Sequence, residues 1–183
     1  MEKTRIHRVY LTGFMGSGKS TIAPILANTL GYSAIDIDLE IEKITGKKIT
    51  SIFSDFGEKY FRDIERTLLH KVSQFQGCVI SLGGGTISHE DNLKIIKETG
   101  ILVYLKTEPE RIFQRLKHKT DRPLLKNQEG LSLSDEELNN RITMLLTERE
   151  PFYRHADVTI RTDNKRIGLT VDEIVRSIQK FID

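Results

Sequence analysis

Short apolar runs alternate along the chain with longer amphipathic stretches. Five runs have the length and content of strands, and they lie at Val9–Thr12, Ser33–Ile37, Cys78–Leu82, Ile101–Leu105 and Asp157–Ile160. Stretches with helical spacing separate them, near Ser20–Leu30, Glu58–Phe75, Asn92–Glu98, Pro109–Lys117, Ser134–Arg149 and Val171–Phe181. Because strand–helix–strand units form right-handed crossovers, the alternation predicts a three-layer α/β fold, with a parallel five-stranded sheet between helices.

Length and composition fit one globular domain spanning residues 1–183, with 38% hydrophobic and 30% charged residues. The net charge is only +2 and basic residues are scattered, which argues against a nucleic-acid partner. The apolar runs are too short to cross a bilayer, and the charged start does not resemble a signal peptide. The single cysteine, Cys78, excludes an internal disulfide. We therefore expect a cytoplasmic protein without a membrane partner, and a monomer.

The phosphate-binding pattern G-x-x-x-x-G-K-[ST] is complete at Gly13–Ser20, between an apolar run and an amphipathic stretch. Glycines let the backbone wrap around an anion, so that N–H groups and a helix N-terminus face phosphates. Lys19 can then reach the β- and γ-phosphates, and the Ser20 hydroxyl can bind Mg²⁺. The motif predicts a nucleoside triphosphate site. Pro24, within the next helix, should remove a backbone hydrogen bond and bend that helix.

Two aspartates, Asp36 and Asp38, end the second apolar run. Period-two alternation would turn both to one side, at the edge of the sheet where ligands bind, with Ile37 in the core. One carboxylate can then hold water on Mg²⁺ while the other accepts a proton from a substrate hydroxyl. Asp38 can equally be the cap of a following helix, and the pattern leaves both interpretations open.

Three further features have both a catalytic and a purely structural interpretation. Gly83, Gly84 and Gly85 follow the third strand and either expose backbone N–H groups to a ligand or form a tight turn. Arg62 and Glu65 are spaced for contact on one helix face, as in an ordinary surface pair. The aperiodic segment 117–131 is either a surface loop or a lid, and Arg122 before Pro123 favours a lid that closes over a triphosphate.

Together these blocks resemble the shikimate kinase family. The family's signature is matched by Arg62, Glu65 and Leu69, followed after a gap of nine residues by 79–87 with the three glycines. Its other blocks match in order at 13–21, 36–38, 122–125 and 149–153, so the resemblance covers nearly the whole chain. It implies a nucleoside-monophosphate-kinase-like P-loop fold, with a substrate-binding region at about 33–63 and a mobile lid at about 115–131.

The resemblance also implies an activity: transfer of the γ-phosphoryl group of MgATP to the 3-hydroxyl of shikimate. The implied catalytic residues are Lys19, Asp38 as base, and Arg122. Shikimate would contact Asp38, Arg62, Gly83, Gly84, Gly85 and Arg149, while Mg²⁺ would contact Ser20 and, through water, Asp36. The nucleotide would contact Gly13, Met15, Gly16, Ser17, Gly18, Lys19, Ser20, Thr21, Arg115, Arg122 and Arg166, with Arg115 and Arg166 beside the adenine.

The chain departs from the family pattern at Phe152, where leucine is usual, and at Ala23-Pro24, where a glycine and a basic residue are frequent. Three other functions fit these residues less well. A gluconate-type kinase would lack this glycine context, and a GTP switch would need aspartate where Ile167 stands. A non-catalytic regulator would have lost Lys19, Asp38 or Arg122, which are all present.

Overall fold

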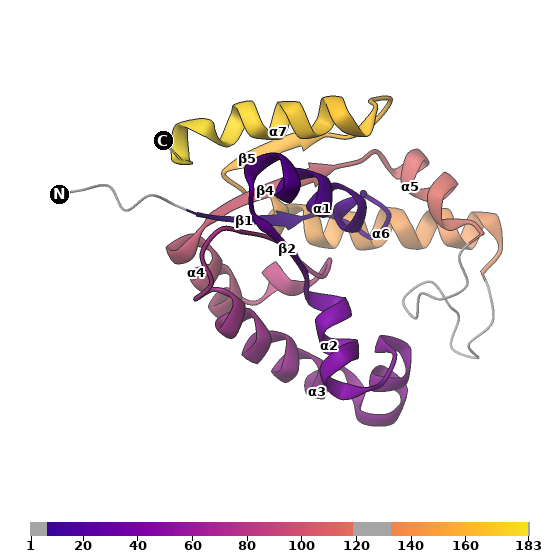
Figure 1. The fold of residues 1–183 in the computed structure, drawn as a ribbon. Coiled ribbons are helices and arrows are strands. Elements are labelled where there is room, and N and C mark those ends of the chain that lie inside the picture. Colours follow the sequence, from indigo (N-terminus) through magenta and orange to yellow (C-terminus); the bar gives the residue numbers. More distant parts are fainter. Residues whose placement is uncertain (1–6, 119–132, 183) are drawn as a thin grey trace.

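Five parallel strands form the centre of the fold in the computed structural model, which describes residues 7–118 and 133–182 (Figure 1). The strands are β1 (Arg8–Thr12), β2 (Ser33–Asp36), β3 (Cys78–Ser81), β4 (Ile101–Lys106) and β5 (Val158–Arg161), in the spatial order β2-β3-β1-β4-β5. The predicted parallel five-stranded sheet is thus confirmed. The second strand ends at Asp36, one residue earlier than expected, because a helix begins at Ile37.

Helices cover both faces of the sheet. The helices α1 (Lys19–Leu30) and α7 (Ile167–Ile182) lie on one face, and α3 (Ile49–Val72) and α4 (Glu90–Thr99) lie on the other (Figure 1). Alternate residues of β1 follow this division, since Val9 and Leu11 pack with α1 and α7 whereas Tyr10 packs with α3. A third apolar cluster joins α5 (Pro109–Leu116) to α6 (Asp135–Tyr153) around Phe14. The three layers follow directly from the apolar pattern.

Local signals explain most helix ends. Gly31 closes α1 in the left-handed conformation, and Ser134 forms a capping box with Glu137 at the start of α6. Helix α1 continues through Pro24 to Leu30. Among the described residues, no helix is long and apolar enough to span a membrane.

The region between β2 and β3 differs most from the sequence-based expectation. Helix α2 (Ile37–Thr45) follows β2 directly, and α3 begins at Ile49 rather than near Glu58. Gly57 divides α3 with φ 80° and ψ 172°, values that glycine adopts readily and other residues rarely do. The expected helix at Glu58–Phe75 is therefore the second part of a longer, kinked element, which ends at Val72.

The strand order places a crevice at the carboxyl ends of β1 and its two neighbours. From β1 the chain passes through α1 to β2, which lies beyond β3 on one side, and later reaches β4 on the other side. Connections that leave in opposite directions open the space between them, and ligands bind there in open α/β sheets. The short turn η1 (Thr86–Ser88) follows β3 at this end.

Candidate active site

A single cleft of about 630 Å³ brings together most of the side chains that the sequence motifs identify. Its lining contains the expected residues Met15, Gly16, Ser17, Gly18, Lys19, Ser20, Thr21, Asp36, Asp38, Arg62, Gly83, Gly84, Gly85, Arg115 and Arg149. Gly13 and Arg166 are not part of the lining, and Arg122 lies outside the described residues. The cleft therefore unites these residues from six separate parts of the chain.

The phosphate loop occupies the centre of the cleft, with an unusual backbone. Gly13, Gly16 and Gly18 have φ values of 147°, 80° and 100°, and Gly18 is the N-cap of α1. The Lys19 ammonium donates to the carbonyl oxygens of Gly13 at 2.7 Å and Phe14 at 3.1 Å. Ser17 is buried, and its hydroxyl has no hydrogen-bond partner within the described part of the chain. An anion bound by the loop would supply an acceptor for that hydroxyl.

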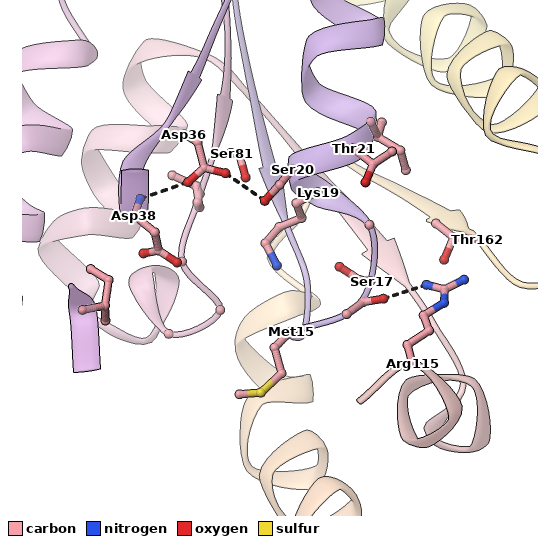
Figure 2. A pocket seen from close by; sticks show the side chains of 18 of the residues that line it. Met15, Ser17, Lys19, Ser20, Thr21, Asp36, Asp38, Ser81, Arg115 and Thr162 are labelled. Atoms are coloured by element: carbon pink, nitrogen blue, oxygen red, sulfur yellow. Dashed lines mark hydrogen bonds between the residues drawn. The ribbon is translucent and has the colours of Figure 1, made fainter. Parts of the chain in front are cut away.

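The two aspartates meet the loop at its α1 side. The Ser20 hydroxyl donates to Asp36 Oδ2 at 2.8 Å, and Asp36 Oδ1 accepts from the backbone N–H of Asp38 at 3.1 Å (Figure 2). Asp36 is therefore the cap of α2, and of the two interpretations left open for Asp38, the one that made it the cap of this helix is wrong. Because β2 has already ended, the first turn of α2, rather than strand alternation, places Asp38 in the cleft. Ile37 is fully buried, as expected.

The glycine triplet makes room for charged side chains. A Cβ atom added to Gly83 would lie 2.9 Å from Glu65 Oε1 and 3.3 Å from Asp38 Oδ1. On Gly84 it would lie 2.9 Å from Arg149 Nη1, and on Gly85 it would lie 2.9 Å from Arg62 Nη2. None of these glycines has a positive φ. Close approach by the neighbouring side chains, rather than the conformation of a tight turn, therefore explains why glycine stands at all three positions.

Arg62 reaches the triplet from α3 and is held by two carboxylates. Its Nη1 lies 2.9 Å from Oε2 of Glu65, which is completely buried, and its Nη2 lies 3.0 Å from Oε1 of Glu58, which is 67% exposed. The other oxygen of Glu65 accepts from the Thr86 hydroxyl at 2.6 Å. Burial acts to lower the pKa of Arg62, but Glu65 and Glu58 outweigh it and leave the pKa raised. The pair is thus a buried anchor, not an ordinary surface pair.

Arg149 approaches the triplet from α6, on the other side. Its guanidinium lies over the ring of Phe14, 5.6 Å from the ring centroid. Arg62 and Arg149 each closely approach one glycine of the same short segment, so two guanidinium groups face one small region of the cleft. Planar guanidinium groups bind carboxylates in a bidentate manner. This end of the cleft is suited to a small ligand that bears a carboxylate.

Arg115 extends from α5 to the opposite end of the cleft. Its Nη1 donates to the carbonyl oxygen of Gly16 at 2.7 Å (Figure 2). Thr162, Lys165, Ile167 and Thr170 line the same cleft, whereas the exposed Arg166 does not. This end therefore has room for the part of a nucleotide that extends beyond the phosphates.

Comparisons with known proteins agree with this geometry. The sequence model of the shikimate kinase family matches residues 15–182. The chain is 50% identical over 174 residues to the shikimate kinase of Chlorobium limicola, covering 95% of this chain and 87% of that protein. The chain belongs to the shikimate kinase family. Its activity is therefore ATP-dependent phosphoryl transfer to a hydroxyl group.

Solved structures of the shikimate kinase family support the fold. The enzyme from Acinetobacter baumannii, solved in complex with shikimate, is 34% identical and superposes with a TM-score of 0.86, covering 97% of this chain and 95% of that one. The enzyme from Bacteroides thetaiotaomicron is also 34% identical, with a TM-score of 0.85 and coverage of 94% and 98%. The predicted P-loop kinase fold is thus confirmed.

Several lining residues of this shikimate kinase family member were not identified from the sequence. Ile49, Phe53 and Phe61 come from α3 and form an apolar wall, and only their helical spacing could have signalled a shared face. Thr162 directly follows β5, so the rule that ligands bind at the carboxyl ends of strands could have identified it. Its hydroxyl contacts that of Thr107 at 2.7 Å.

Proposed function

We propose that the cleft aligns the γ-phosphoryl group of ATP with the 3-hydroxyl of shikimate, and that the residues identified above carry out the transfer. One observation carries this proposal: Arg62, Arg149 and Asp38 converge on the glycine triplet within the same cleft as the phosphate loop. Phosphoryl transfer depends mainly on alignment and on neutralising charge, and one shared cleft permits both.

The nucleotide phosphates bind at the loop and at the N-terminus of α1. The ammonium of Lys19 leaves the carbonyl oxygens of Gly13 and Phe14 and binds phosphate oxygens instead, while the buried hydroxyl of Ser17 gains an acceptor. The remaining nucleotide extends towards Arg115 and Thr162. Arg166 is assigned to the adenine by resemblance alone, since the cleft lining does not include it.

Ser20 and Asp36 provide the two oxygens expected at a Mg²⁺ site, Ser20 directly and Asp36 through water. Their hydroxyl and carboxylate are 2.8 Å apart at the edge of the phosphate loop, and Mg²⁺ prefers oxygen ligands. Within residues 7–118 and 133–182, no group of three His, Cys, Asp or Glu residues could hold a metal. This fits Mg²⁺, which is usually bound by one or two protein groups together with substrate phosphates. The ion would supply positive charge beside the transferred group.

Shikimate binds with its carboxylate between Arg62 and Arg149. Its ring lies against the apolar wall that includes Phe53 and Phe61, and the triplet leaves space beside it. Asp38 accepts the proton of the reacting hydroxyl as the new oxygen–phosphorus bond forms, while the bond between the γ-phosphorus and the bridging oxygen of the β-phosphate breaks and ADP leaves. By resemblance to the family, we assign to Arg122 the neutralisation of the remaining charge on the phosphates. Arg122 belongs to the segment 115–131, which we propose as a lid.

The decisive test is coupled ADP release with shikimate, gluconate or AMP as the acceptor. We expect turnover with shikimate only. Asp38→Asn should lower kcat by at least about 100-fold, because a general base contributes roughly that factor or more, while ATP still binds. Turnover with gluconate instead would contradict the carboxylate-clamp roles. An unchanged kcat in Asp38→Asn would contradict the proposed role of Asp38 as the general base.

A second test addresses the metal. Asp36→Asn should raise the Mg²⁺ concentration that gives half-maximal activity, because one of the two protein oxygens loses its charge. Arg122→Lys should lower kcat while the metal requirement stays the same.

We also propose that the protein is a cytoplasmic monomer. One buried free cysteine is in keeping with the cytoplasm, and light scattering after gel filtration tests the oligomeric state.

A further inference from the structure

Tyr153 lies beneath the glycine triplet, in the last turn of α6 and four residues after Arg149. It is completely buried, and its hydroxyl donates to the carbonyl oxygen of Gly84 at 2.9 Å. Residues spaced by four share one face of a helix, so Tyr153 and Arg149 extend from the same side of α6. The motif at 149–153 thus places both an arginine and a phenol at the site.

The guanidinium of Arg149 lies near the same hydroxyl. A phenol has a single proton, which Tyr153 gives to Gly84, and arginine can only donate. The Tyr153 hydroxyl therefore donates to Gly84, and its oxygen can still accept a hydrogen bond from Arg149. A Cβ atom on Gly84 would lie 2.9 Å from Arg149 Nη1 and 3.8 Å from the Tyr153 hydroxyl, so the three groups meet at one point.

We propose that Tyr153 is a positioning residue for shikimate, whose hydroxyl fixes the guanidinium of Arg149 against the carbonyl of Gly84. This inference rests on the proposed role of Arg149 in binding the substrate carboxylate. A long arginine side chain loses considerable rotamer freedom when it binds, and a fixed acceptor beside it reduces that loss at the moment of binding.

The ring of Tyr153 is itself held in place. It stacks on Tyr104 of β4, with centroids 4.7 Å apart and planes at 23°. The Tyr104 hydroxyl donates to Glu150 Oε2 at 2.9 Å, and Lys106 contacts the other oxygen of Glu150 at 3.2 Å. Burial raises the pKa of Tyr153 to about 12, so its hydroxyl keeps its proton at neutral pH.

The stacked pair supplies its own matched control. Tyr153→Phe and Tyr104→Phe each delete one buried hydroxyl and keep the rings, but only the Tyr153 hydroxyl donates to Gly84 and lies near Arg149. A residue that serves only the stability of the core would produce similar effects in both variants. If Tyr153 positions Arg149, the two variants should differ in their KM for shikimate.

The experiment is steady-state kinetics with each substrate varied, on wild type, both tyrosine variants and Arg149→Lys, with melting temperatures alongside. Tyr153→Phe should raise the KM for shikimate about tenfold, the loss of one hydrogen bond to a charged group, with kcat and the KM for ATP within about twofold. Tyr104→Phe should leave the KM for shikimate unchanged. Equal KM values for shikimate in the two tyrosine variants would overturn the inference.

Arg149→Lys separates this inference from the proposed function. A raised KM for shikimate in Arg149→Lys, with none in Tyr153→Phe, would leave the clamp standing and overturn the role of Tyr153. An unchanged KM in Arg149→Lys would overturn both. If Tyr153→Phe does not fold, wild-type protein labelled at tyrosine Cζ answers the question: shikimate should shift the Tyr153 signal more than that of Tyr104, and equal or absent shifts would overturn the inference.

Discussion

Two glycine-rich loops follow neighbouring strands of the sheet, and they require glycine for different physical reasons. The phosphate loop after β1 needs the backbone freedom of glycine, since Gly13, Gly16 and Gly18 all have positive φ. The triplet after β3 has no positive φ, yet a Cβ atom at each position would collide with a charged side chain. The backbone of the phosphate loop is shaped to bind an anion. The triplet has no side chains of its own, so neighbouring side chains have space to approach the substrate.

This difference predicts how each loop responds when a glycine is replaced by a larger residue. A side chain at Gly13 of the phosphate loop meets backbone that cannot move away, and at Gly16 and Gly18 the positive φ is strained for other residues, so the loop itself must change shape. A side chain on the triplet meets the flexible ends of Arg62, Arg149 or Glu65, which can move while the fold persists. Substitutions on the first loop should therefore reduce both stability and ATP binding, whereas those on the second should affect shikimate alone.

Gly13→Ala should have the largest effect. The added Cβ would lie 2.7 Å from the backbone carbonyl oxygen of Leu105, at a φ of 147° that is strained for any other residue. Strain and overlap together should destabilise the protein by about 3–5 kcal/mol. Calorimetric titration with ATP should show affinity reduced at least about 100-fold. Gly31→Ala is the control, because Gly31 also has a positive φ, of 70°, but an added Cβ would meet nothing within 4 Å, and it should cost only about 1 kcal/mol. Equal losses in both variants would contradict the role of the Leu105 contact.

Glu65→Gln tests the charge on which the second loop depends. The substitution keeps the shape of a fully buried side chain but removes its charge beside Arg62, which should lower the free energy of unfolding by about 2–3 kcal/mol. Glu58→Gln removes the exposed partner of the same arginine and should change stability by only about 0.3 kcal/mol. Urea unfolding measures both. ATP affinity should be unchanged in each, and a loss of ATP affinity in Glu65→Gln would show that the two loops are coupled.

The contrast between the loops also marks how far the sequence could predict this molecule. The phosphate loop was predictable in position and purpose, because its chemistry depends on backbone groups whose spacing is local in the chain. The sheet was predictable for a similar reason, since buried parallel strands such as Ile101–Lys106 are continuous apolar runs. The catalytic and binding roles of the individual residues remain predictions.

The second loop was predictable only as a group of glycines. Its purpose depends on side chains that arrive from α3 and α6, and no local pattern shows that Glu65 is buried or that Tyr153 meets Gly84. The apolar pattern predicts that β2 extends to Ile37, but β2 ends at Asp36, because the hydrogen bonds that make Asp36 a helix cap compete with strand alternation. Gly57 divides α3, and the pattern predicts only the part of that helix that follows it.

Gly84→Ala should affect shikimate without affecting the nucleotide. The added Cβ would displace the Arg149 guanidinium, 2.9 Å away, and the KM for shikimate should rise about tenfold, equivalent to about 1.4 kcal/mol. The KM for ATP and the melting temperature should change little. Gly168→Ala is a matched control in α7, where the added methyl group meets nothing within 4 Å, and it should leave both KM values unchanged. A fall in ATP affinity or a large loss of stability in Gly84→Ala would contradict the proposed difference between the two loops.

Alkaline pH should produce the smallest effect, through the phenol that supports the second loop. Burial raises the pKa of Tyr153 from 10.0 to about 12, so the folded protein holds this proton more tightly than the unfolded chain does. The resulting stability is fully present below pH 10 and is lost as the pH rises from 10 through 12, by about 1.4 kcal/mol at pH 11. Tyr153→Phe lacks this contribution, so the stability difference between wild type and variant should narrow between pH 9 and pH 11. Urea unfolding at each pH measures it, and two parallel stability curves would show that the phenol titrates alike in both states.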